Sequence, residues 1–134
     1  MDIVEILLDT AVEDNRLLMT IQDQGDDLTK PRDLDFFLYA KTEERATLVA
    51  DFITDNRYGR PSIQSSYKND GSPTWRIKVT IHAPSTENVV HTLSAFFACL
   101  SQIYDLDYDG WETSIEKNSL PVTSQPSPKL HQSF

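Results

Sequence analysis

Acidic and aromatic side chains alternate in one short segment, and these residues are the best suited in the chain to bind something. In chain order they are Asp105, Asp107, Tyr108, Asp109, Gly110 and Trp111. Alternate residues of a strand share a face, so the three carboxylates are expected to form an acidic stripe. Such a stripe could hold a divalent cation, but calcium sites usually draw their oxygen ligands from a glycine-turned loop. We therefore expect the stripe to meet lysine and arginine side chains of a protein partner.

The glycine and the two aromatic residues of this segment allow two interpretations. Gly110 removes a side chain inside a strand, which marks a β-bulge or the close approach of another backbone. Tyr108 and Trp111 then either plug the core beneath the first helix or form an exposed anchor for a partner. Large aromatic side chains tend to be buried, which favours the core plug. The six residues together are the predicted partner-binding site.

Enzyme chemistry needs a base, a nucleophile or a metal in converging positions, and the chain offers no such pattern. His82, His91 and His131 are spread along the chain without the spacing of a zinc site. With 4 glycines, the chain lacks a glycine-rich phosphate loop, and it contains no Gly-x-Ser-x-Gly. We predict that the protein is not an enzyme and that it has no cofactor and no metal site.

The charge of the chain bears on the kind of partner. The formal net charge is −9, from 12 basic and 21 acidic side chains. An anionic body repels the phosphates of nucleic acids, so direct nucleic-acid binding is disfavoured and a basic protein partner is favoured. The charge could equally serve solubility alone. No run approaches the ~20 apolar residues of a membrane span, and the acidic start differs from a basic signal peptide, so we expect no membrane partner and a cytoplasmic protein.

Helical and strand periods alternate along the chain in a recognisable order. We expect a first helix over 2–24, a second helix from Thr42 to near Asn56, and a long helix that starts near Thr86. Strands are expected over 34–40, 62–67, 74–83 and 106–115. The order after the first helix is β-α-β-β-α-β, so we predict an α+β, ferredoxin-like domain with a four-stranded antiparallel sheet of order 4-1-3-2. The first helix then either covers the open side of the sheet or packs at its edge.

The long helix and the third strand indicate which faces are buried. Apolar residues of the helix recur at spacings of three and four, which puts them on one wide stripe; they are Val89, Leu93, Phe96, Leu100 and Ile103, with Val90, Phe97 and Tyr104 beside them. The strand alternates an apolar face (Trp75, Ile77, Val79, Ile81) with a polar and cationic face (Arg76, Lys78, Thr80, His82). We predict that the apolar face packs on the helices. The domain is predicted to span 1–117, and 118–134, rich in Ser and Pro, to be a flexible tail.

The most specific motif is Tyr108-Asp109-Gly110-Trp111-Glu112-Thr113, at the junction of the long helix and the last strand. Together with Asp14-Asn15-Arg16 in the first helix and Gly25-Asp26-Asp27 after it, the motif resembles the regulator of ribonuclease activity B family over roughly 12–115. That family consists of inhibitors of ribonuclease E in bacteria and has a helix followed by this same ferredoxin-like order.

The resemblance implies a non-enzymatic, protein-binding regulator that inhibits a ribonuclease, of the ribonuclease E kind, through an acidic surface. Two alternatives remain open on the sequence. One is an immunity-type or orphan binding module that neutralises a different protein. The other is a ferredoxin-like domain that binds a small molecule.

Overall fold

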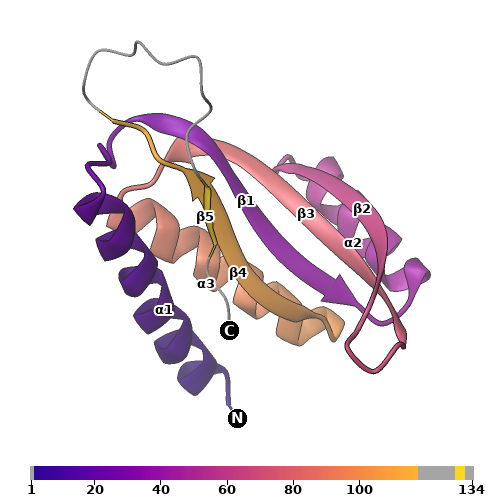
Figure 1. Cartoon of the computed structure of the whole chain (residues 1–134). Helices are drawn as coiled ribbons and strands as arrows, with labels where there is room; N and C mark the ends of the chain where they lie inside the picture. The colour runs from indigo at the N-terminus through magenta and orange to yellow at the C-terminus, as the bar shows by residue number, and fades with distance from the viewer. Residues whose placement is uncertain (1, 118–128, 132–134) are drawn as a thin grey trace.

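Three helices and five strands make up the described part of the chain, residues 2–117 and 129–131 of a computed structural model (Figure 1). In chain order they are α1 (Ile3–Asp23), β1 (Pro31–Ala40), α2 (Glu43–Asp55), β2 (Arg60–Tyr67), β3 (Pro73–Pro84), α3 (Glu87–Tyr104), β4 (Asp107–Ser114) and β5 (Lys129–His131). Each helix and each of the first four strands lies within a few residues of its predicted position. Thr42 is the N-cap of α2, and its side chain accepts a hydrogen bond from the Arg45 N–H at 3.1 Å.

The strands form one antiparallel sheet of order β2-β3-β1-β4-β5. Its first four strands have the predicted order 4-1-3-2, read from the opposite edge, so the α+β class and the strand order are confirmed. The ferredoxin-like classification itself stays a prediction. β5, at residues 129–131, lies within the predicted tail and was not predicted as a strand. The rest of that predicted tail, 118–128 and 132–134, lies outside the described residues.

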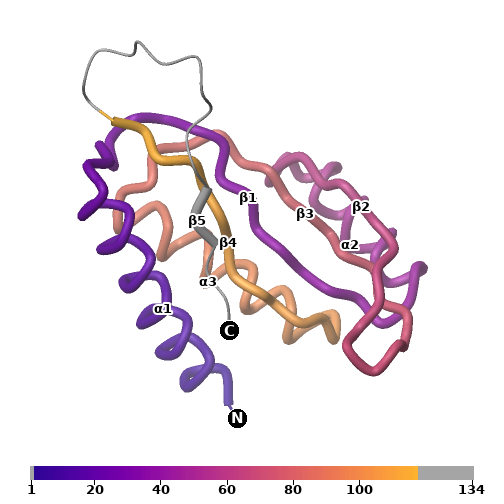
Figure 2. Tube along the Cα trace, viewed as in Figure 1, coloured from indigo at the N-terminus to yellow at the C-terminus, as the bar shows by residue number. Residues whose placement is uncertain are grey.

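The helices share one side of the sheet. In the view of Figure 1, α2 lies behind β2 and β3, and α3 lies behind β4. Figure 2 shows α1 running beside α3 at the β4 side of the molecule, and the two helices are in extensive contact. Leu17, Leu18 and Ile21 of α1 are buried in the same core as the sheet residues. Of the two predicted positions for α1, the structure shows the one at the edge of the sheet. α1 therefore does not cover the open side of the sheet.

The centre of the core is β1, the strand between β3 and β4. Leu34, Phe36 and Leu38 share its helix-facing side and are fully buried. The Phe36 ring stacks on Phe97 of α3 with centroids 4.9 Å apart, and it also lies 6.4 Å from the Trp111 ring of β4. Such aromatic pairs add a specific geometry to the apolar area that they bury.

The buried face of α3 differs from its predicted stripe. Ile103, expected inside, is 74% exposed, and the buried residues of the helix are Val90, Ser94, Phe97, Ala98, Leu100 and Ser101. α3 packs on the sheet on one side and on α1 on the other. Val90, Phe97 and Leu100 of the predicted stripe are buried as expected. The small side chains of Ser94 and Ser101 fit at the second contact, so they extend the buried face in a way that an apolar pattern does not indicate.

A buried ion pair links the segment after α1 to the start of β1, and both of its residues also bind backbone groups at or just after the end of β4. Arg32 and Asp26 are 2.7 Å apart, with side chains 1% and 0% exposed. Arg32 also donates to the carbonyls of Asp27 and Ser114, and Asp26 accepts a hydrogen bond from the backbone N–H of Glu116 at 2.6 Å. The pair therefore satisfies buried polar groups of three chain segments at once. Within the described residues, no helix is long and apolar enough to cross a bilayer.

Candidate partner-binding site

A β-bulge shapes the predicted site in β4. Tyr108 is opposite Leu38 of β1, whereas Trp111 is opposite Phe36, so three steps along β4 face two along β1. Gly110 has φ +81, the left-handed region that glycine adopts at low cost, as in one class of bulge. The extra residue turns both aromatic side chains toward the helices. Of the two features expected at Gly110, a bulge or the close approach of another backbone, the register shift shows the bulge.

Trp111 is part of the core. It has no exposed surface, and its indole Nε1 donates a hydrogen bond to Oδ1 of Asp14 in α1 at 3.1 Å. Gly110 is also buried. These two positions support the core plug beneath the first helix over the exposed anchor. A role for Trp111 in partner binding stays a prediction, and it would have to act through the position of α1.

Asp14 collects hydrogen bonds from both neighbouring elements. Its fully buried carboxylate accepts a bond from Ser94 Oγ of α3 at 2.9 Å, besides the one from Trp111. Ser94 Oγ is also 2.7 Å from the Tyr108 hydroxyl. Because Ser94 gives its single proton to Asp14, the Tyr108 hydroxyl is the donor in that second bond. The hydrogen bonds thus run from Tyr108 to Ser94 and from Ser94 to the carboxylate of Asp14. In such a chain each bond polarises the next.

A histidine closes this cluster on the solvent side. His91 of α3 is 26% exposed, and its Nδ1 lies 3.5 Å from Oδ2 of Asp14. Its Nε2 is 2.9 Å from the side-chain oxygen of Asn15 and 3.9 Å from Glu87. Sequence reasoning missed this cluster, although one signal was present: Asp14 is a single acid within the buried stripe that contains Thr10, Leu17, Leu18 and Ile21.

The surroundings of Tyr108 disfavour ionisation of its phenol. Burial raises the pKa of Tyr108 well above its ordinary value of 10.0, and the negative charges of Asp14 and Asp109 act in the same direction. The hydroxyl therefore stays protonated and remains the donor to Ser94 over the physiological range. This keeps β4 bound to α3 through a neutral group.

The three aspartates of the predicted stripe do not form one surface. Asp105 is not in the strand: it is the C-cap of α3, with φ 56, and its carboxylate lies 3.2 Å from Lys41 Nζ. Asp107 is exposed at the start of β4, and Asp109 is half-buried beside the bulge. The prediction of three alternating carboxylates was wrong at Asp105, because α3 ends in a left-handed residue that changes the direction of the chain before β4. Among the described residues, no group of three His, Cys, Asp or Glu side chains is arranged to hold a metal ion.

A comparison with protein families shows the family to which this arrangement belongs. Residues 11–113 match the family described as regulator of ribonuclease activity B. The chain belongs to the regulator of ribonuclease activity B family. The match confirms the resemblance, and it includes both Asp14 and Trp111, the two ends of the hydrogen bond between α1 and β4. No curated protein matches the chain.

In this member of the regulator of ribonuclease activity B family, α1 and α2 carry the two largest groups of acidic residues. α1 with its N-cap Asp2 holds six carboxylates and one arginine, and α2 holds four carboxylates and one arginine. The strands β2 and β3 hold no carboxylate and carry Arg60, Arg76 and Lys78. The Arg76 guanidinium lies 5.0 Å from the centre of the Phe37 ring. The molecule is therefore acidic on its helical side and basic on β2 and β3.

Proposed function

We propose that the protein is a non-catalytic regulator that inhibits a ribonuclease, of the ribonuclease E kind, by binding it as a protein partner. Membership of the regulator of ribonuclease activity B family carries this proposal. The acidic helical side supplies the physical means. A ribonuclease must attract RNA phosphates with lysine and arginine side chains, and the same side chains attract clustered carboxylates. The cytoplasmic location expected from the sequence fits this role and stays a prediction.

The buried cluster supports a structural role rather than a catalytic one. Asp14, His91 and Ser94 are the residue types of a hydrolytic triad, but their contacts differ from those of a triad. Ser94 is fully buried and donates to Asp14, whereas His91 faces Asp14 and Asn15. A nucleophile needs a base within hydrogen-bond reach and a route to substrate. The cluster instead joins α1 to α3 and β4, and so fixes the acidic helix in place.

The proposal is tested with a purified ribonuclease E-type enzyme and a fluorescent single-stranded RNA substrate. We expect the protein to slow cleavage in a saturable way and to co-elute with the enzyme in size-exclusion chromatography. A matched control is Asp70→Asn, which removes one charge in the turn between β2 and β3, on the far side of the sheet from α1 (Figure 1). Unchanged cleavage and separate elution at micromolar concentrations of both proteins would contradict the proposal.

A further inference from the structure

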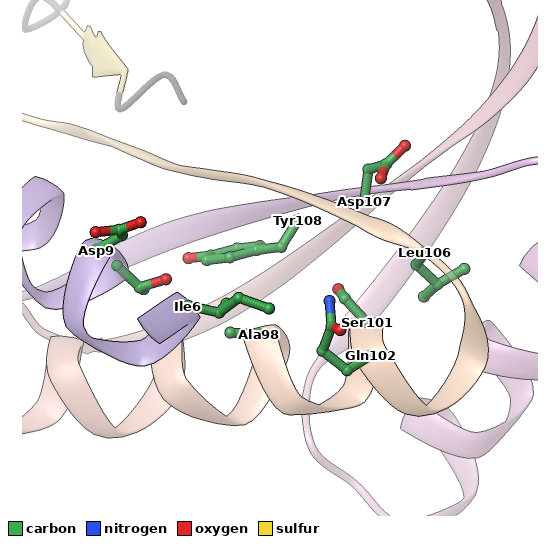
Figure 3. A pocket seen from close by; sticks show the side chains of 9 residues that line it. Ile6, Asp9, Ala98, Ser101, Gln102, Leu106, Asp107 and Tyr108 are labelled. Atoms are coloured by element: carbon green, nitrogen blue, oxygen red, sulfur yellow. The ribbon is translucent and has the colours of Figure 1, made fainter. Parts of the chain in front are cut away.

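An open cavity lies where the N-terminal half of α1 faces α3 and the start of β4 (Figure 3). Its volume is about 250 Å³. Its floor and walls are mainly apolar, and the residues that line it are Ile6, Asp9, Thr10, Ala98, Ser101, Gln102, Leu106, Asp107 and Tyr108. Small-molecule pockets usually have volumes of roughly 300–1,000 Å³. This cavity has the size for one side chain of a partner rather than for a whole ligand.

Thr10 brings a hydroxyl group to the wall of the cavity. The residue is 4% exposed, and no hydrogen bond of its hydroxyl occurs among the described residues. Two other helical threonines behave differently: Thr20 and Thr92 donate to the carbonyls four residues earlier, at 2.8 and 2.7 Å. The Thr10 hydroxyl is thus available at the open cavity, and a donor or acceptor of a partner that reaches it forms a hydrogen bond there.

The other polar groups around the cavity favour a cation. Figure 3 shows Asp9 on α1 near the hydroxyl end of the Tyr108 ring, and Gln102 on α3 with its side-chain amide directed toward the cavity. Neither Asp9 nor Asp107 forms an ion pair within the described part of the chain. None of the described residues that line the cavity is a lysine or an arginine. The aromatic wall of Tyr108 also favours a cation, because the face of an aromatic ring is negative.

We infer that this cavity receives an arginine side chain of the protein partner, an inference that rests on the proposed function. The methylene stem packs on Ile6, Ala98 and Leu106. The planar guanidinium lies along Tyr108, pairs with Asp9 and donates to the hydroxyl of Thr10. Arginine fits this set better than lysine, because its planar group stacks on a ring while donating at several edges. The acidic face of α1 attracts the partner, and the cavity fixes its position.

The first experiment measures the affinity of full-length variants for the purified ribonuclease by isothermal titration calorimetry. Asp9→Asn removes the carboxylate, and Thr10→Val removes the hydroxyl with little change in shape. We expect each variant to raise Kd by about tenfold, as for a central interface contact, while Asp70→Asn binds like the wild type. Thr10→Val loses no hydrogen bond inside the protein, so its melting temperature should not fall. If both variants bind with wild-type affinity, the cavity inference is wrong although the proposed function stands.

The second experiment does not depend on the ribonuclease. N-acetyl-arginine amide is titrated into the isotope-labelled protein, with the neutral citrulline analogue as the matched control. We expect saturable NMR shifts at the amides of Asp9, Thr10 and Ala98 with arginine, and none with citrulline. Absent shifts, or equal shifts with both probes, overturn the inference. Shifts with arginine together with no binding of the ribonuclease keep the cavity and reject the proposed function.

Discussion

The indole Nε1 of Trp111 donates to the carboxylate of Asp14, 97 positions earlier in the chain, and both side chains are fully buried. This bond joins β4 to α1, the helix that carries the largest group of acidic residues. The acidic surface of α1, which we propose binds the partner, is therefore positioned from inside the core. A change in the interior can alter binding without touching the surface.

Truncation of Trp111 should affect the fold before it affects binding. Trp111→Ala removes a fully buried indole and should lower the free energy of unfolding by about 3–5 kcal/mol. Trp111→Phe keeps most of the apolar volume but removes the donor to Asp14, so a smaller loss is expected. Urea denaturation followed by circular dichroism measures both. An unchanged midpoint for Trp111→Ala, together with lost partner binding, would instead make Trp111 an interface anchor.

The pH dependence of stability should report on Tyr108. Its pKa in the folded protein is raised, so the protonated phenol contributes stability that is present below the unfolded pKa of about 10. That stability is lost as the pH rises above this value, because unfolding then releases the proton. Urea midpoints measured between pH 8 and 11 should fall steeply at the alkaline end for the wild type and less steeply for Tyr108→Phe. Tyr67→Phe is the control, because Tyr67 is 76% exposed; an equal flattening in both variants would exclude Tyr108 as the cause.

Features that depend on local sequence were predictable, whereas a feature that depends on tertiary contacts was not. The bulge at Gly110 was predictable, because a glycine inside a strand has few other uses. The alternation of Trp75, Ile77 and Val79 likewise predicted β3 and its buried face. Asp14 could not be assigned a role, because its donors Ser94 and Trp111 come together only once α1 packs on α3.

The fifth strand marks the other limit of sequence reasoning. Residues 129–131 have no strand period of their own, and they become β5 by pairing with β4, with Leu130 in register with Thr113. Edge pairing of this kind depends on an available backbone rather than on side-chain pattern. The prediction that Asp105 lies in the strand was wrong for a related reason. The left-handed residue at the end of α3 is not a glycine, so the sequence does not indicate it.

The buried pair of Arg32 and Asp26 should be far more sensitive than the surface pair of Lys41 and Asp105. Arg32→Met leaves a buried carboxylate without its cation and removes three bonds to carbonyls, so we expect a loss of about 3–5 kcal/mol. Lys41→Met breaks a pair whose side chains are 62% and 70% exposed and should cost less than about 1 kcal/mol. Chemical denaturation of both variants makes the comparison. Similar losses would mean that the buried pair is replaceable by apolar contact.

Binding of the ribonuclease should weaken as salt is added. The charges on α1 are mostly exposed, and the screening length falls from about 10 Å at 0.1 M to about 3 Å at 1 M ionic strength. We expect the association rate measured by surface plasmon resonance to fall more than the dissociation rate rises, because long-range attraction acts on the encounter. Glu5→Gln combined with Asp9→Asn should flatten this salt dependence, whereas Asp70→Asn should leave it unchanged. A salt-insensitive association rate in the wild type would count against attraction by the acidic helical side.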